Sequence, residues 1–191
     1  MRCLVLVKHS TPALEPRVPP DRWRLSEIGR RRAAALADTL TGWNAASLYS
    51  SDEPKAIETA EIISSKLGLP VKVVPGFREH LRNGVPFMTD AKWRVVVLNA
   101  INRPDQLVLG SETVEEARRR FSDALTIAES MSPPGAMIIV SHGTVISMFI
   151  ARLTGADPAS MWERLGLPGL VVVTWPSPGR IEHQQNFDSV V

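Results

Sequence analysis

The chain has 191 residues, of which 44% are hydrophobic and 22% are charged, and its formal net charge at pH 7 is +2. This length is sufficient for one well-buried core, so we expect a single domain over residues 1–191. The ordinary glycine and proline content excludes a fibrous or disordered chain, and the near balance of charges argues against a nucleic-acid-binding protein.

The first half of the sequence alternates β-rich runs with helical patterns. The apolar residues 3–7 predict a buried central strand, and four prolines in residues 10–23 predict an irregular loop directly after it. Ser26 and Gly68 are suitable residues to begin and end helices. The elements expected after the loop are a helix over 26–40, a strand over 46–51, a helix over 53–68 and a strand over 71–75.

The second half continues this alternation after residues 76–110, where the pattern is weakest. That segment predicts a turn at 83–84 and a helix over 90–100. The elements expected beyond it are a helix over 113–131, a strand over 136–141, a helix over 144–155, a short helix over 158–166, and strands over 169–175 and 180–187. The last two strands are joined by a turn at 178–179. The whole pattern predicts a three-layer α/β/α sandwich around a mostly parallel sheet.

The single cysteine and the lengths of the apolar stretches indicate in which cellular compartment the protein is expected. Cys3 is the one cysteine and lies in the first strand, which excludes an internal disulfide framework and favours a small core residue in a reducing compartment. The opening apolar run is too short for a signal peptide. The later apolar stretch over 136–153 is interrupted by Ser141, His142 and Gly143, so we expect no membrane span and a cytoplasmic protein.

Two runs of arginine, residues 30–32 and 118–120, could be read as phosphate-binding patches. Each run lies within an alanine- and glutamate-containing helical pattern. We therefore expect both runs to form solvated helix faces.

Two of the four histidines occupy matching positions. His9 in VLVKHST and His142 in IIVSHGT each follow a buried β-rich run by two residues and precede a small residue and a threonine. The carboxyl ends of parallel strands form ligand sites, so we expect these two imidazoles to face each other across one pocket, with Lys8 beside them. The alternative is structural, with each histidine ending a strand and bonding to a loop. His183, on a terminal strand, is expected to be structural.

Several common kinds of site lack their sequence motifs. The sequence has no HExxH and no close pair of histidine and cysteine, so we expect no metal site. It also lacks GxGxxG after the first strand, GxxxxGK[ST] and GxSxG, which disfavours a dinucleotide cofactor, a P-loop and a serine hydrolase. The remaining candidate is a cationic, histidine-centred pocket suited to an anion such as phosphate.

The motifs resemble those of the histidine phosphatase superfamily, which includes cofactor-dependent phosphoglycerate mutases and fructose-2,6-bisphosphatase-like phosphatases. In that family the first strand leads into Arg-His-Gly and then Thr or Ser, where this chain has VKHST. Four further blocks follow in family order. LSEIGRRRAAALADTL is similar to the family's Leu-Thr-x-x-Gly helix, and YSSDEPKAIETAEII is similar to its Ser-Ser-x-x-x-Arg-Ala helix. GSETVEEARRRF is similar to its Gly-Glu-Ser segment, and VSHGTVI matches its second histidine motif. The resemblance implies a phosphoglycerate mutase-like fold and a small phosphorylated substrate.

The resemblance also implies chemical roles. His9 would attack phosphorus and become a phosphohistidine, which requires a neutral imidazole whose tautomer is fixed at the other nitrogen. Glu79 falls where the family keeps an acidic residue and would be the general acid. The alternative for Glu79 is a loop carboxylate paired with Arg78 or Arg82, and His80 is a weaker candidate for the acid.

Charge that builds up on phosphate oxygens during transfer is stabilised by fixed positive donors. By resemblance these donors are Lys8, Lys55 and a protonated His142. The other groups expected around the phosphate are Ser10, Thr11 and Gly143.

The sequence departs from the family pattern at the phosphate pocket. Lys8 and Lys55 stand where the family has arginines, and Ser10 stands where it has glycine. Lysine lacks the planar fork of arginine, so the exchange is not conservative. The chain has 5 lysines and 17 arginines, and if two basic positions were filled at random from these, both would be lysine about one time in twenty. We expect a specialised anion pocket that recruits one loop arginine, the candidates being Arg17, Arg78 and Arg82.

Three functions are therefore open. The first is a phosphatase acting on a small phosphomonoester through phospho-His9, and the second is a phosphoglycerate mutase-type phosphotransferase. The segment after residue 150 offers little material for a lid that would exclude water, which favours hydrolysis. The third is a catalytically degenerate member that binds an anion. Substrate identity depends on the loops at 12–24 and 76–110, where the pattern is weakest.

Overall fold

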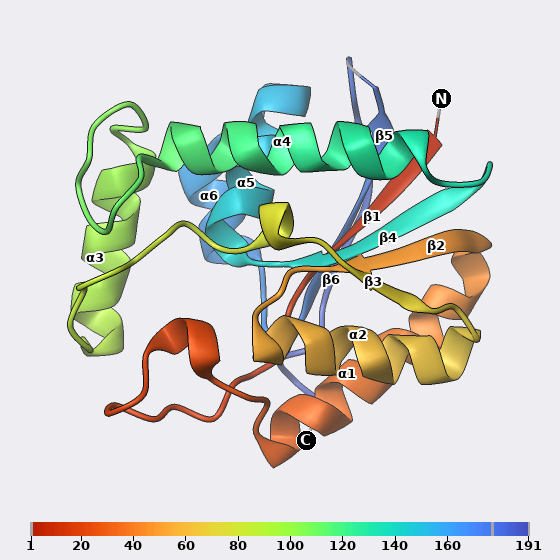
Figure 1. Cartoon of the computed structure of the whole chain (residues 1–191), viewed down its shortest axis with the longest axis horizontal. Coiled ribbons are helices and arrows are strands. Elements are labelled where there is room, and N and C mark those ends of the chain that lie inside the picture. The colour runs from red at the N-terminus through yellow and green to blue at the C-terminus, as the bar shows by residue number, and fades with distance from the viewer. Residues whose placement is uncertain (1, 177, 191) are drawn as a thin grey trace.

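Strands of one sheet run through the middle of the molecule in the order β3-β2-β4-β1-β5-β6 (Figure 1). The computed structural model describes residues 2–176 and 178–190. Within them the strands are β1 (Arg2–Lys8), β2 (Ala45–Ser50), β3 (Val71–Val73), β4 (Ala136–Ser141), β5 (Gly169–Trp175) and β6 (Ile181–Asn186). The four strands from β3 to β1 are parallel, and β5 and β6 are antiparallel to their neighbours.

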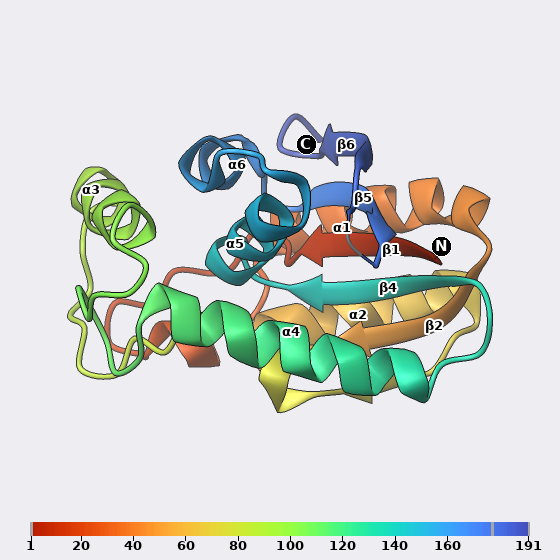
Figure 2. The same ribbon diagram turned by 90° about the horizontal axis from the view of Figure 1, so that it is seen from above.

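Helices cover both faces of this sheet, which confirms the predicted fold class. One face carries α1 (Glu27–Leu40) and α2 (Pro54–Leu67), and the other carries α4 (Val114–Ser130) and α5 (Gly143–Thr154) (Figures 1 and 2). The remaining helices, α3 (Asp90–Ile101) and α6 (Pro158–Arg164), pack beside α5. No helix in the described part of the chain is both long and apolar enough to cross a membrane.

The side chains of β1 explain why it lies in the centre. Successive side chains of a strand point to opposite faces. Leu4 and Leu6 pack with α4 and α5, whereas Val5 and Val7 pack with α1 and α2. All four are fully buried, and burial of each such side chain contributes about 1.5–3 kcal/mol. A strand buried on both faces is the structure that a continuous apolar run predicts.

The helix ends follow the predicted capping residues. The Ser26 side chain accepts a hydrogen bond from the Gly29 N–H at 3.0 Å at the start of α1, and Gly68 ends α2 with a φ of 69°. In the weakly patterned segment, the predicted turn is present and Gly84 has a φ of 76°. Between β5 and β6, the predicted turn at 178–179 adjoins Ser177, which is outside the described residues.

The order of the strands brings the ends of β1 and β4 together. These strands are parallel neighbours, and Lys8 pairs with Ser141 in the register of the sheet. The connection after β1 passes over the α1/α2 face, whereas the one after β4 passes over the α4/α5 face. The crevice between two such strands is where open α/β sheets bind ligands. His9 and His142 lie at this point.

Candidate active site

The main chain fixes His9 at the end of β1. Its N–H donates to the Ser141 carbonyl at 2.9 Å, which extends the β1–β4 ladder by one residue. Its ring Nδ1 lies 2.7 Å from the Ser10 carbonyl. A carbonyl can only accept, so Nδ1 carries the proton and Nε2 keeps a free lone pair. The side chain is nearly buried, with 8% of the residue exposed.

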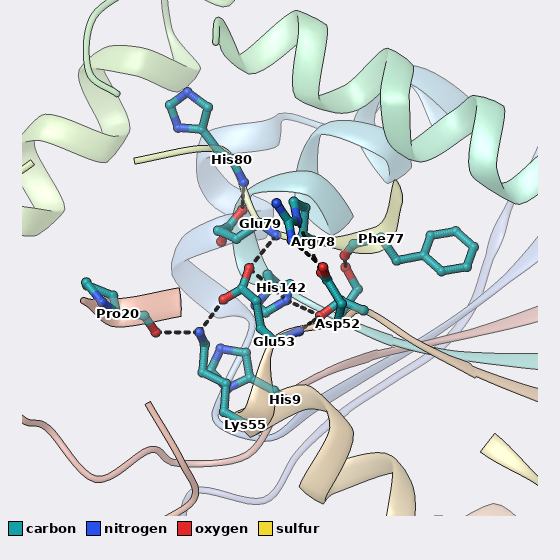
Figure 3. Close-up of polar contacts among 12 residues, drawn as sticks. His9, Pro20, Asp52, Glu53, Lys55, Phe77, Arg78, Glu79, His80 and His142 are labelled. Atoms are coloured by element: carbon teal, nitrogen blue, oxygen red, sulfur yellow. Dashed lines mark hydrogen bonds and ion pairs between the residues drawn. The ribbon is translucent and has the colours of Figure 1, made fainter. Parts of the chain in front are cut away.

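His142 lies beside His9, at the start of α5. The two ring centroids are 5.1 Å apart and the ring planes are inclined by 60°. The Nε2 of His142 is 2.7 Å from the Ser51 hydroxyl and 3.4 Å from Glu53 Oε1 (Figure 3). Its Nδ1 is buried without a hydrogen-bond partner in the described part of the chain. The two predicted histidines are thus brought together.

The surroundings of both imidazoles favour their neutral forms. Burial lowers the pKa of His9 well below its usual value, and the neighbouring His142 and Lys55 lower it further. Burial and Lys55 likewise lower the pKa of His142, against the opposing effect of Glu79. A neutral His9 suits a nucleophile. A protonated His142, as expected from the resemblance, requires a bound anion to raise its pKa.

Lys55, in the first turn of α2, is held by a buried carboxylate. Its Nζ forms an ion pair with Glu53 Oε2 and donates to the Pro20 carbonyl at 2.7 Å (Figure 3). Both side chains of the ion pair are only 7% exposed. Glu53 also accepts the Glu79 N–H at 2.9 Å through Oε1. A carboxylate therefore lies in the middle of the expected cationic pocket.

Lys8 is held by a carbonyl instead. Its Nζ donates to the Leu165 carbonyl at 2.7 Å. A Cβ at Gly143 would lie 3.2 Å from the Lys8 Cε, so the glycine leaves room for the lysine stem. Desolvation lowers the pKa of Lys8 to about 8, although Glu79 and Asp188 raise it in part.

Glu79 is part of the loop after β3, and its side chain reaches the start of α5. Its carboxylate accepts the N–H groups of His80 at 2.9 Å and Thr144 at 3.1 Å, and it pairs with Arg82 at 3.1 Å. Burial raises the pKa of Glu79, but Arg82 and the other positive groups and donors outweigh burial and lower the pKa to about 2. The pairing with Arg82 that the sequence left open as an alternative is present, and the carboxyl is ionised at neutral pH.

Arg82 is the loop arginine that the fold brings to this site. Besides Glu79, it contacts the Thr144 hydroxyl at 3.1 Å, and its guanidinium stacks 4.2 Å from the centre of the Trp93 ring. Its side chain is 19% exposed. Of the other two candidates, Arg78 pairs with Asp52 and Arg17 is exposed.

The hydroxyls of Ser10 and Thr11 are engaged by the main chain. Ser10 donates to the Gly29 carbonyl at 2.7 Å, and Thr11 donates to the Leu167 carbonyl at 2.8 Å. A Cβ at Gly29 would lie 2.1 Å from the Thr11 carbonyl oxygen, so only glycine allows α1 to approach this segment. These contacts position the loop after His9.

Four further residues shape the site and were not among the predicted site residues: Ser51, Glu53, Glu112 and Arg120. Arg120 donates to the carbonyls of Gly76, Arg78 and Glu79 and pairs with Glu112 at 2.6 Å. The expectation of a solvated face holds for Arg119, whose side chain is 66% exposed, and is wrong for Arg118 and Arg120, whose side chains are 14% and 23% exposed. The Arg120 side chain points inward because residues 76–79 present three carbonyls that need donors.

No group of three or more His, Cys, Asp or Glu residues in 2–176 and 178–190 is arranged to hold a metal ion. Two cavities, of about 550 and 500 Å³, are lined by neither histidine. The second lies at the opposite end of the sheet, and the first is lined by Glu163, Arg164, Gly166, Gln184, Gln185, Asn186 and Asp188. The convergence of titratable groups, rather than hollow volume, marks the histidine pair as the candidate site.

Comparison with known proteins agrees with the geometry. Residues 17–186 match the family model of the histidine phosphatase superfamily, branch 1. The chain belongs to this superfamily. The matched range begins after the first motif, so the Lys8-His9-Ser10 variant lies outside it.

Curated relatives in this superfamily have two kinds of name. The uncharacterized phosphatase PhoE of Bacillus subtilis is 26% identical over 141 residues, which cover 74% of this chain and 70% of that protein. The probable phosphoglycerate mutase GpmB of Cronobacter sakazakii is 25% identical over 169 residues, which cover 85% of this chain and 74% of that protein.

Solved structures share the fold. A mycobacterial glucosyl-3-phosphoglycerate phosphatase superposes with a TM-score of 0.77 at 23% identity, covering 95% of this chain and 97% of that one. A phosphoserine phosphatase from Entamoeba histolytica, in complex with 3-phosphoglyceric acid, has a TM-score of 0.77 at 17% identity and full coverage of both chains, 100% each. At these identities the structures establish the fold of this chain.

Proposed function

We propose that this protein is a phosphatase that hydrolyses a small phosphomonoester through a phosphohistidine formed on His9. The observation that carries the proposal is the hydrogen bond between His9 Nδ1 and the Ser10 carbonyl, with His142 alongside. This contact leaves Nε2 unprotonated in a neutral ring, which is the form that can attack phosphorus. Water then accepts the phosphoryl group in the second step.

The positive groups for the transition state come from three parts of the chain. They are Lys8 at the end of β1, Lys55 at the start of α2 and Arg82 in the loop after β3. Arg82 supplies the planar guanidinium that neither lysine offers. Fixed donors of this kind stabilise the charge that builds on the equatorial phosphate oxygens.

Glu79 is our candidate for the proton donor to the leaving oxygen. Its pKa of about 2 keeps it ionised next to Arg82. A bound phosphate dianion raises this pKa by charge repulsion and draws Arg82 toward itself, and both effects favour the protonated carboxyl. The role therefore depends on substrate binding to prepare the acid.

Two other functions have specific support. A phosphoglycerate mutase-type transfer is supported by relatives such as GpmB of Cronobacter sakazakii, and it shares the first half of the reaction. A degenerate, anion-binding role is supported by lysine at both positions where the family has arginine. The three functions differ in the fate of the phosphoryl group.

Labelling of His9 separates these functions. The protein is incubated with a radiolabelled aryl phosphate, quenched in alkali, and examined for acid-labile phosphate at His9. We expect label that is lost to water, together with a rate loss of about 10³-fold or more in His9→Ala. The exposed His183→Ala on β6 is the matched control and should behave as the wild type. Label released only to an acceptor hydroxyl indicates the mutase, and folded protein that takes up no label indicates the binding function.

A further inference from the structure

A second acid besides Glu79 lies inside the cationic pocket. The carboxylate of Glu53 pairs with Lys55 through Oε2, while its Oε1 accepts the Glu79 N–H at 2.9 Å and lies 3.4 Å from His142 Nε2 (Figure 3). Glu53 is 6% exposed, so these contacts form out of water. Its three partners come from α2, from the loop after β3 and from the end of β4.

These partners overlap with the groups that would hold a phosphate. Lys55 is one of the donors assigned to phosphate binding in the proposed function, and His142 is a donor that the family resemblance implies. The inference rests on the proposed function for the identity of the anion. A carboxylate and a phosphate are both oxyanions that seek N–H donors. Two anions cannot share one buried ammonium without strong repulsion, because charges interact strongly where water is excluded.

We propose that Glu53 is an affinity determinant of this site whose carboxylate competes with phosphate for Lys55. Phosphate binding then requires the Lys55 ammonium to turn from Glu53 toward the ligand. The competition weakens the binding of substrate and of inorganic phosphate alike. Release of inorganic phosphate is thereby accelerated, which benefits a hydrolase that would otherwise be inhibited by its product.

This competition explains why lysine, rather than arginine, suits position 55. An ammonium on a flexible stem is a point charge that can exchange one oxyanion for another. An arginine would form a bidentate, planar pair with Glu53, which holds its geometry and resists exchange. The Pro20 carbonyl, 2.7 Å from Lys55 Nζ, keeps a second acceptor in place while the exchange occurs.

The test is the affinity for inorganic phosphate, measured by isothermal titration calorimetry on the full chain. We expect Glu53→Gln to tighten binding about tenfold or more, since a buried competing charge is removed. In the Lys55→Met background the same Glu53→Gln change should have no such effect, because the contested ammonium is gone. Glu58→Gln, which removes a carboxylate on α2 that pairs with Arg24 and Arg30, is the matched control and should bind as the wild type.

Glu53→Asp is a second variant, for use if the glutamine variant does not fold. Its shorter side chain withdraws the carboxylate from Lys55 and should tighten binding by a smaller factor. Unchanged or weaker phosphate binding in folded Glu53→Gln or Glu53→Asp overturns the proposal, because Glu53 would then only position Lys55. Tight binding by Glu53→Gln without phospho-His9 supports the competition and rejects the phosphatase, whereas phospho-His9 without tighter binding does the reverse.

Discussion

Lys8 and Lys55 are two cations that the sequence predicted for one anion pocket, but the fold holds them in different ways. Lys55 forms a buried ion pair with Glu53. The Lys8 ammonium donates to the main-chain carbonyl of Leu165, and burial lowers its pKa to about 8. One pocket therefore contains a cation whose charge is compensated by a direct carboxylate partner and a cation that loses its proton in mildly alkaline solution.

The difference shows that the partner of a buried lysine decides its chemistry. An ammonium beside a carboxylate is stabilised as an ion, and its removal leaves the carboxylate buried and uncompensated. An ammonium facing a carbonyl lacks that compensation, so desolvation lowers its pKa. The following predictions, from the largest expected effect to the smallest, test this contrast.

Replacement of each lysine by methionine should affect stability unequally. We expect Lys55→Met to lower the free energy of unfolding by about 3–5 kcal/mol, because Glu53 is left without its cation. Lys8→Met should remain within about 1 kcal/mol of the wild type or exceed it, because a desolvated charge is removed. Urea unfolding at pH 7 measures both. Equal losses for the two variants would contradict the contrast.

The stability contributed by Lys8 should depend on pH. Its pKa is about 8 in the folded protein, below the ordinary value of 10.5, so between these limits the unfolded chain binds more protons than the folded one. The free energy of unfolding of the wild type should therefore rise with pH relative to that of Lys8→Met, by about 1.4 kcal/mol per pH unit and about 3 kcal/mol in all. Paired urea titrations at pH 7.5, 9 and 10 test this, and a flat difference would reject it.

Catalytic activity should decline above pH 8, because Lys8 loses its proton there. We expect kcat/KM for a phosphomonoester to fall up to about tenfold per pH unit above pH 8, since this quantity reports ionisations of the free enzyme. Lys8→Arg keeps its charge over this range and should lack the decline. A pH–rate profile of both proteins is the measurement, and an unchanged decline in Lys8→Arg would assign the proton to another group.

The smallest effect is expected at Glu58, whose side chain is 14% exposed but whose cationic partners lie on the surface. Glu58 on α2 pairs with Arg24 and Arg30, whose side chains are 71% and 52% exposed. We expect Glu58→Gln to change the free energy of unfolding by about 1 kcal/mol or less, far below the effect of Lys55→Met on the same helix. Thermal and urea unfolding under identical conditions compare the two, and a loss as large as that of Lys55→Met would show that burial does not set the difference.

Most of the architecture could be predicted from local patterns. The apolar run of β1, the capping serine of α1 and the glycine that ends α2 act over a few residues, and the observed elements follow them. The sequence also predicted that His9 and His142 would meet, because parallel strand ends share one edge of a sheet. Each of these inferences depends on hydrophobic periodicity, on the local chemistry of a helix end or on a topological rule.

Glu53 and Arg120 could not be predicted in this way. Glu53 falls at a position that the family's Ser-Ser-x-x-x-Arg-Ala pattern leaves unspecified. Arg120 is the last of three consecutive arginines, and the other two pair with Glu115 on the same helix. Arg120 turns inward to the carbonyls of a loop more than forty residues away in sequence. No local pattern reports such a contact.

The sequence by itself determined the sheet, its helices and the meeting of two histidines at the ends of β1 and β4, because hydrophobic period and strand order act through short segments and general rules. Only the tertiary structure decided the charge partners: Glu53 for Lys55, a carbonyl for Lys8, and Arg82 for Glu79. These pairings depend on which loops converge on the strand ends. Because a buried charge takes its pKa and its energy from its neighbours, they also decide how the pocket handles an anion.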